Sequence, residues 1–377
     1  MRMKVLACLL LSSATVSAEV EINFLEWGYL PEGYKARFEA YAKSQGMNVT
    51  LNKVEPFITD FDSVYNALRK QQADVVMPTS YFFKTHDSRL LKVLLPLDLS
   101  KVSNYQFLKS EFKNRHYDID DAGNHYALPH TVAHFSLAYD SEKIDAPDSW
   151  RDLYGSQLKQ SFRVYCDQFE PLVLTSVLAN GMDVQAFTSG EILKDSDMMA
   201  SLRVSVSAQL KNADGFWFNQ VNDCDDLKNQ TVATTWGLEL TECNAANNQK
   251  WRLATLEEGN LFSLDSLSLG RHLENNPEKR EAAYLLVDFL MSEAHFQRLL
   301  AGLPSIEGST TNVDRRLTDL EVAVLPDQPL PTFDEEYLIP YLPTPIKNRY
   351  KRLVREAMAT AGVGELSAAC PWDMTSK

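Results

Sequence analysis

The sequence lacks the local motifs on which most enzymes depend. Its 377 residues contain no G-x-S-x-G nucleophile elbow, no H-E-x-x-H zinc motif and no glycine-rich phosphate loop. Paired carboxylates also serve glycosidases, but no other motif accompanies them here. We therefore predict neither an enzymatic activity nor a cofactor. Internal repeats and low-complexity segments are absent as well.

Long hydrophobic runs are also absent after the first eighteen residues. At the N-terminus, Arg2 and Lys4 precede an apolar run over residues 5–11, and a small-residue sequence, V-S-A, follows. This order predicts a signal peptide over residues 1–18. No later stretch is long and apolar enough to span a membrane, so we expect a secreted, soluble mature chain.

Basic residues are scarce relative to acidic ones. Lys and Arg number 37 against 51 Asp and Glu, which gives a net charge of −14. The predicted signal peptide holds two basic residues and no acidic one, so its removal makes the charge −16. An acidic surface argues against nucleic acid as a partner and favours cationic ligands.

Cysteines are few, and none is spaced as C-x-x-C, which argues against a zinc site. Four cysteines remain in the mature chain, and in an oxidising compartment they allow three pairings. A bridge between Cys224 and Cys243 closes a modest loop and is the pairing we predict. Cys166 is then either a buried thiol beside Asp167 or a partner for Cys370.

The chain does contain the periodic patterns of a globular α/β protein. Hydrophobic residues make up 45% and charged residues 23%, and the length suits roughly two domains. Predicted strands and helices alternate along the first part of the chain, which favours a parallel sheet. Ligands of such sheets bind beyond the carboxyl ends of the strands, where Trp27, Tyr29 and residues 79–83 fall. The predicted strands are 21–26, 47–54 and 74–78, and the predicted helices are 33–44 and 61–71.

A long strand predicted over residues 126–139 is able to cross between two lobes. A second α/β lobe is then indicated by a helix that starts near residue 148 and a strand over residues 163–166. The further predicted helices are 170–178, 201–211, 277–301 and 346–357, and the further strands are 232–236 and 262–267.

Two carboxylates, Asp167 and Glu170, follow the strand at residues 163–166. The two side chains share a face if Asp167 caps the next helix. An Asp at the cap and a Glu three residues later are both favoured there, because the N-terminus of a helix carries a partial positive charge. The same pair also suits a binding site. The local sequence leaves both interpretations open.

Several of these segments together resemble the periplasmic polyamine-binding proteins, which hold spermidine or putrescine. The resemblance rests on residues 25–29, 74–81, 129–139 and 277–304 and extends over residues 21–357. It implies the two-lobed periplasmic binding protein fold of type II, an α/β fold in which each lobe is a mixed sheet flanked by helices. The ligand cleft then lies at the hinge.

The resemblance also implies the positions of the ligand-binding residues. Two departures from the family pattern are Ser263 and Leu303, where the family has aromatic residues. Three carboxylates would accept ammonium groups, and aromatic faces would cover the methylenes and the cations. The implied ligand-binding residues are Trp27, Tyr29, Thr79, Ser80, Tyr81, Asp167, Glu170, Trp236 and Asp265.

The implied lobe 1 comprises residues 19–133 and 265–312, and the implied lobe 2 comprises residues 134–264 and 313–377. The chain would cross the hinge near 130–135, 260–265 and 312–320. The protein is expected to be a periplasmic monomer when free, and to close on a polyamine by hinge motion that a membrane partner reads.

Three functional hypotheses follow. Some members of the family sense norspermidine and spermidine and pass the signal to a membrane enzyme of cyclic-di-GMP turnover, which controls biofilm formation; the divergent cleft favours this hypothesis. The alternative is the uptake component of an ABC-type polyamine transporter. A metal-ion-binding periplasmic protein is the third, because His130 and His134 lie four residues apart, although a strand separates them by about 13 Å.

Overall fold

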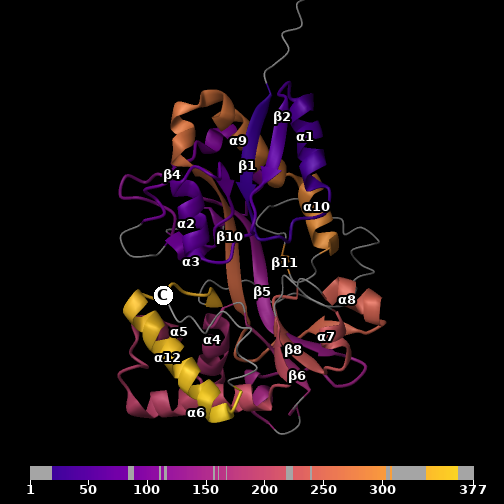
Figure 1. The fold of residues 1–377 in the computed structure, drawn as a ribbon, viewed down its shortest axis with the longest axis vertical. Coiled ribbons are helices and arrows are strands. Elements are labelled where there is room, and N and C mark those ends of the chain that lie inside the picture. The colour runs from indigo at the N-terminus through magenta and orange to yellow at the C-terminus, as the bar shows by residue number, and fades with distance from the viewer. Residues whose placement is uncertain are drawn as a thin grey trace, which may run out of the picture.

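The computed structural model describes residues 19–83, 89–109, 112–113, 117–155, 158–159, 161–166, 168–217, 224–237, 240–302, 306–307 and 337–363. Figure 1 shows two lobes joined by long strands that run through the middle of the molecule. One continuous mixed sheet connects the lobes, in the strand order β2-β1-β3-β10-β5-β8-β6-β7. The predicted signal peptide and the third hinge crossing, residues 312–320, lie outside the described residues.

Lobe 1 is built on three parallel strands, as the sequence predicts. β1 (Val20–Leu25) pairs with β2 (Val49–Lys53) on one side and with β3 (Val75–Val76) on the other. The connecting helices are α1 (Tyr34–Ser44) and α2 (Phe61–Arg69). A capping box, in which the Asp60 side chain accepts from the Ser63 amide, starts α2 at the predicted position.

Two long antiparallel strands, β5 (Leu128–Asp140) and β10 (Leu261–Gly270), join the lobes. β10 pairs with β3 in lobe 1, and β5 pairs with β8 (Val232–Thr235) in lobe 2. The register of the pair shifts at a bulge between Asp265 and Ser266. Both strands are buried along almost their whole length, because sheet or helices cover both faces.

Lobe 2 carries the parallel strands β6 (Phe162–Tyr165) and β7 (Gly215–Trp217) beside β8. Helix α4 (Glu170–Ala179) follows β6, and it is apolar on all sides because it lies in the core of the lobe. α6 (Ser196–Asn212) and α12 (Thr344–Ala361) lie at the base of the lobe in Figure 1.

One predicted helix is wrong in its extent. The helix predicted over residues 277–301 is two helices, α9 (Pro277–Leu290) and α10 (Glu293–Gly302). The Ser292 hydroxyl donates to the Phe289 carbonyl at 2.6 Å and so helps to end α9. The N-cap residue of α4 is Phe169, whose side chain makes no capping hydrogen bond. Asp167, the residue of the capping interpretation, lies outside the described residues.

Shorter elements complete the described chain. The helix predicted from residue 148 is a short 3₁₀ turn. Among the described helices, none has both the length and the apolar character that crossing a bilayer requires. The shorter elements are α3 (Ser80–Phe83), β4 (Leu94–Leu95), η2 (Leu99–Lys101), η3 (Ser103–Phe107), η5 (Trp150–Tyr154), α5 (Val184–Ser189), α7 (Asp225–Lys228), α8 (Leu240–Asn247), β9 (Trp251–Leu253), η6 (Arg271–Asn275) and β11 (Ile306–Glu307).

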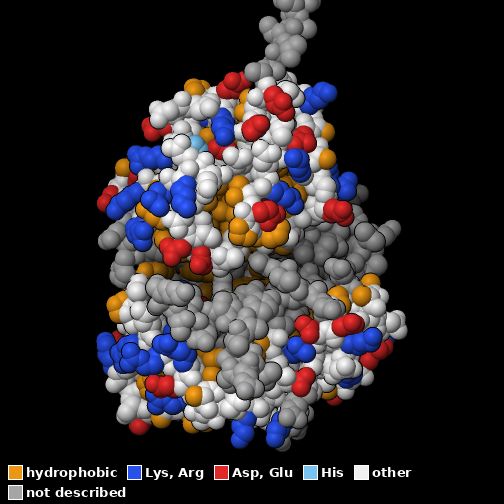
Figure 2. Space-filling model, in the orientation of Figure 1, with side chains coloured by type: hydrophobic (Ala, Val, Ile, Leu, Met, Phe, Trp, Pro, Cys, Tyr) orange, Lys and Arg blue, Asp and Glu red, His pale blue; other side chains and the backbone are white. Residues whose placement is uncertain are grey.

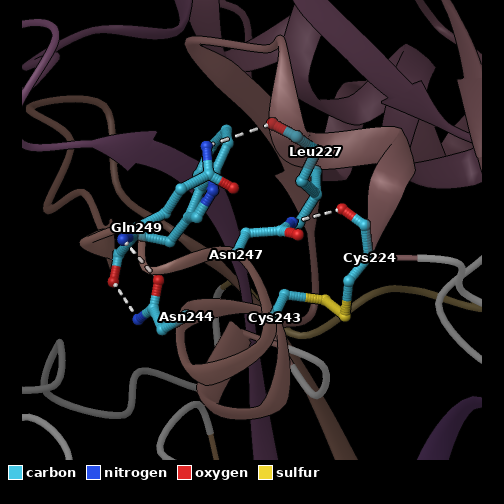
Figure 3. The surroundings of a disulfide bond; sticks show 7 residues. Cys224, Leu227, Cys243, Asn244, Asn247 and Gln249 are labelled. Atoms are coloured by element: carbon cyan, nitrogen blue, oxygen red, sulfur yellow. Dashed lines mark hydrogen bonds between the residues drawn. A yellow bond between two sulfur atoms is a disulfide. The ribbon is translucent and has the colours of Figure 1, made fainter.

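The predicted disulfide between Cys224 and Cys243 is confirmed, with a Cα–Cα distance of 4.9 Å. Figure 3 shows that the bond ties Cys224, the N-cap residue of α7, to Cys243 in α8, and that the Asn247 side chain donates to the Cys224 carbonyl at 2.6 Å. Gln249 donates to the Leu227 carbonyl at 3.4 Å beside it. Cys166 is also disulfide-bonded, and its partner lies outside the described residues.

Candidate ligand-binding site

The predicted carboxylate Asp265 lies where three strands meet. It stands opposite Thr131 in the register of β10 and β5, and Thr79, just after β3, forms an isolated antiparallel bridge to it on the other side. The bulge after Asp265 changes the direction in which its side chain points. The residue is only 5% exposed.

Neutral hydroxyl groups surround the Asp265 carboxylate. The Tyr29 hydroxyl donates to Oδ2 at 3.0 Å and lies 2.7 Å from the Thr131 hydroxyl, so Thr131 is the donor in that second contact. The Ser263 hydroxyl lies 3.4 Å from Oδ1 and 2.8 Å from the Thr79 hydroxyl. Tyr29 and Ser263 therefore contact the carboxylate, and Thr131 and Thr79 stand behind them in the same network of hydroxyls.

The charge of Asp265 lacks a counter-ion within the described chain. No Lys, Arg or His among the described residues forms an ion pair with it. Burial raises the pKa of its carboxyl to about 7, although the hydroxyl donors lower it in part. Burial, and then the negative charge of Asp265, raise the pKa of Tyr29 well above its usual value, so Tyr29 remains a neutral donor. A buried carboxylate in this setting is suited to accept a cation from a ligand.

Predicted aromatic residues line the same region of lobe 1. The Trp27 indole donates to the Met77 carbonyl at 2.8 Å, and its ring lies 6.1 Å from Phe82. The Tyr81 ring lies 4.9 Å from Phe82, and the Tyr81 hydroxyl accepts from Gln168 of lobe 2 at 3.0 Å. This last bond joins the two lobes directly.

Tyr81 senses the charges of both described carboxylates among the predicted site residues. Burial raises its pKa well above the usual value, and the charges of Glu170 and then Asp265 raise it further. Glu170 is the first residue of α4 in lobe 2. Glu170 from lobe 2 and Asp265 from the long strand β10 are therefore both close enough for their charges to act on Tyr81.

Glu170 has an unpredicted partner. The Lys347 ammonium on α12 lies 3.1 Å from Glu170 Oε1. The two residues are 177 positions apart, so no local sequence signal could have revealed the pair. Thr131 and Gln168 are further site residues that the sequence did not single out.

The remaining predicted site residues have no contact with Asp265 or Glu170 among the described interactions. The Trp236 ring is buried and contacts Phe135 at 5.2 Å and Tyr165 at 6.5 Å, so it belongs to an aromatic cluster of lobe 2. Ser80 is buried at the first position of α3. Asp167 lies outside the described residues, as does Leu303.

The two histidines of the metal hypothesis point into different surroundings. His130 Nε2 lies 3.2 Å from the Leu290 carbonyl, and the His130 ring lies 5.7 Å from that of His295. Burial lowers the pKa of His130 to about 3. His134 packs against Phe262 at 4.9 Å. Within the described ranges, no group of three or more His, Cys, Asp or Glu side chains is arranged to hold a metal ion.

Comparison with known proteins shows the fold. The sequence matches no protein-family model and no curated protein sequence. The structure matches the spermidine/putrescine ABC transporter substrate-binding protein PotD from Streptococcus pneumoniae with a TM-score of 0.65 and 16% identity, over 91% of this chain and 99% of that chain. It matches the Tp0655 (TpPotD) lipoprotein of Treponema pallidum with a TM-score of 0.61 and 15% identity, over 91% and 99% of the two chains.

A third match binds a different class of solute. The Trichodesmium protein IdiA (FutA), solved with iron and citrate, matches with a TM-score of 0.55 and 12% identity, over 91% of this chain and 99% of that chain. A shared fold therefore leaves the ligand to be argued from the site. The predicted fold class is confirmed: the chain has the two-lobed α/β fold of the solute-binding proteins.

Proposed function

We propose that this protein is a periplasmic binding protein for a linear polyamine, spermidine or norspermidine, and not an enzyme. The observation that carries the proposal is Asp265, a buried carboxylate with hydroxyl donors and no counter-ion among the described residues. A protonated amine supplies that missing charge. The aromatic residues Trp27 and Tyr81 supply faces for the methylene chain.

Ligand binding would draw the lobes together. The proposed lobe 1 comprises residues 19–133 and 265–312, and the proposed lobe 2 comprises residues 134–264 and 313–377. The bond between Gln168 and Tyr81 supports this proposal, because it joins the two lobes and further contacts of this kind would form as the lobes close. A ligand that contacts both lobes binds the closed state more tightly than the open state, and this difference in affinity shifts the equilibrium toward closure.

The closed state would be read by a membrane partner. We favour a sensor that regulates a cyclic-di-GMP enzyme, because Ser263 replaces an aromatic residue directly beside Asp265. The alternative is the uptake component of an ABC transporter. Deleting the gene separates the two: lost spermidine uptake supports transport, whereas intact uptake with altered cyclic-di-GMP supports sensing.

The proposed ligand is tested by isothermal titration calorimetry with spermidine. Asp265→Asn keeps the size of the side chain and removes its charge, so affinity should fall at least tenfold, about 1.4 kcal/mol. Asp118→Asn is the matched control, because Asp118 is an equally buried carboxylate of lobe 1 whose pKa burial also raises. Equal affinity in the wild type and Asp265→Asn would remove polyamines from consideration.

A further inference from the structure

Glu170, one of the two described carboxylates of the proposed site, is already paired with a lysine of the same chain. Lys347 Nζ lies 3.1 Å from Glu170 Oε1, and the glutamate side chain is 13% exposed whereas the lysine side chain is 42% exposed. The negative charge of Glu170 raises the pKa of Lys347, so the lysine is held in its charged form.

The surroundings of the Lys347 ammonium match those of a ligand ammonium. Besides the carboxylate, the face of Phe169 lies 5.9 Å from Nζ. Gln168, two residues before Glu170, donates to Tyr81 of lobe 1 at 3.0 Å, so the pair lies close to the junction of the lobes. The charge of Asp60 in lobe 1 also raises the pKa of Lys347. A carboxylate and an aromatic face at the junction of the lobes are what a polyamine end group requires.

The Lys347 ammonium should leave its ion pair at a lower free-energy cost than a fully buried lysine would. Lys351, one turn further along α12, lies over the same Phe169 ring at 5.7 Å, and burial followed by the charge of Lys347 lowers its pKa. Figure 2 shows Lys and Arg side chains gathered over α12, where the helix carries five basic residues and one acidic residue. Mutual repulsion and partial exposure reduce the cost of moving Lys347 into water.

We propose that Lys347 is a tethered cation that competes with the ligand for Glu170. The inference rests on the proposed function and deepens it. A ligand ammonium displaces the lysine from the carboxylate, so the exchange conserves charge and never leaves Glu170 unpaired. The apparent affinity for the ligand then falls as Lys347 occupies Glu170 for a larger fraction of the time, because only the unoccupied carboxylate is ready to bind an ammonium group. Lys347 also couples ligand entry to α12.

The test is calorimetry with spermidine on the wild type, Lys347→Met and Lys351→Met. Lys347→Met should bind spermidine at least fivefold more tightly, because the competitor is gone. Lys351→Met removes a cation that lies over the same ring but forms no described ion pair with Glu170, so it should change affinity less than twofold. Adding Glu170→Gln to Lys347→Met should abolish the gain. Lys347→Gln replaces Lys347→Met if the latter fails to fold.

The outcomes separate this inference from the function on which it rests. Unchanged or weaker binding by both Lys347 variants, with normal wild-type binding, overturns the competition and leaves the polyamine site standing. Absence of spermidine binding by the wild type and every variant overturns both.

Discussion

Ligand binding should be strongly dependent on pH, because the carboxylate that accepts the ammonium titrates near neutrality. Burial raises the pKa of Asp265 to about 7. The groups around it are the hydroxyls of Tyr29, Thr131, Ser263 and Thr79, none of which changes charge between pH 5 and 8. A ligand ammonium binds the ionised carboxylate, so ligand and proton compete for the same group.

The magnitude follows from the ionised fraction. With a pKa of about 7, Asp265 is about one-thirtieth ionised at pH 5.5, so the dissociation constant for spermidine should be about 30-fold higher there than at pH 8. The ligand amines resemble the lysine ammonium and stay charged over this range. Binding near pH 7 should also release a proton to the buffer.

Calorimetry between pH 5.5 and 8, repeated at pH 6.5 in two buffers of different ionisation enthalpy, measures both effects. Asp265→Asn is the control, because its weaker binding should not depend on pH in this way. Wild-type affinity that stays within threefold across the range would refute the assignment of the ammonium to Asp265.

Asp265→Asn should weaken spermidine binding but increase the stability of the ligand-free protein. Because the pKa of Asp265 is higher in the folded than in the unfolded chain, its stabilising contribution is complete below about pH 4 and is lost as the pH rises through about 7. Without ligand at pH 8, Asp265→Asn should therefore be more stable than the wild type by up to about 4 kcal/mol. Urea unfolding at pH 5 and pH 8 measures the difference, and equal stabilities at pH 8 would contradict the burial of an unpaired charge.

Three further changes test other parts of the structure. Tyr29→Phe removes a donor to the ionised carboxylate, so the midpoint of the pH profile for spermidine binding should rise by about one unit; an unmoved midpoint would show that this bond does not act on the charge. Replacing both Cys224 and Cys243 by Ser opens a loop of sequence separation 19 and should cost about 3 kcal/mol in guanidinium unfolding without altering affinity. Asp74→Asn removes the buried carboxylate that forms a 2.8 Å ion pair with Lys279 of α9 and a 2.8 Å hydrogen bond with His272 of η6. It should cost about 3 kcal/mol at pH 7, against less than about 1 kcal/mol for the exposed Asp225→Asn.

The parts of the fold that the sequence could predict are those with local periodicity. The alternation around β1 and β2 and the apolar spacing of α1 and α2 are properties of adjacent residues, so the α/β pattern of lobe 1 was readable. The sequence could not predict the break between α9 and α10, because apolar residues continue with helical spacing across it. Only the hydroxyl of Ser292 marks the end of α9.

The sequence also placed aromatic and acidic side chains at the ends of strands, where α/β proteins bind ligands. Trp27 and Tyr29 were singled out in this way, whereas Asp265, inside a predicted strand, was singled out through the family resemblance. It could not show that Tyr29 and Thr131 form a chain of hydroxyls onto Asp265, because that contact depends on the register of β5 against β10.

The sequence alone thus determined the alternating elements and the residue types available for a cation site, and it favoured one of three cysteine pairings, Cys224 with Cys243, which the structure contains. Only the tertiary structure decided how the two described carboxylates differ. Asp265 is buried among neutral hydroxyls and left without a described counter-ion, whereas Glu170 receives Lys347 from a helix 177 residues away. Charge pairing depends on distance in space, and periodicity along the chain carries no record of it.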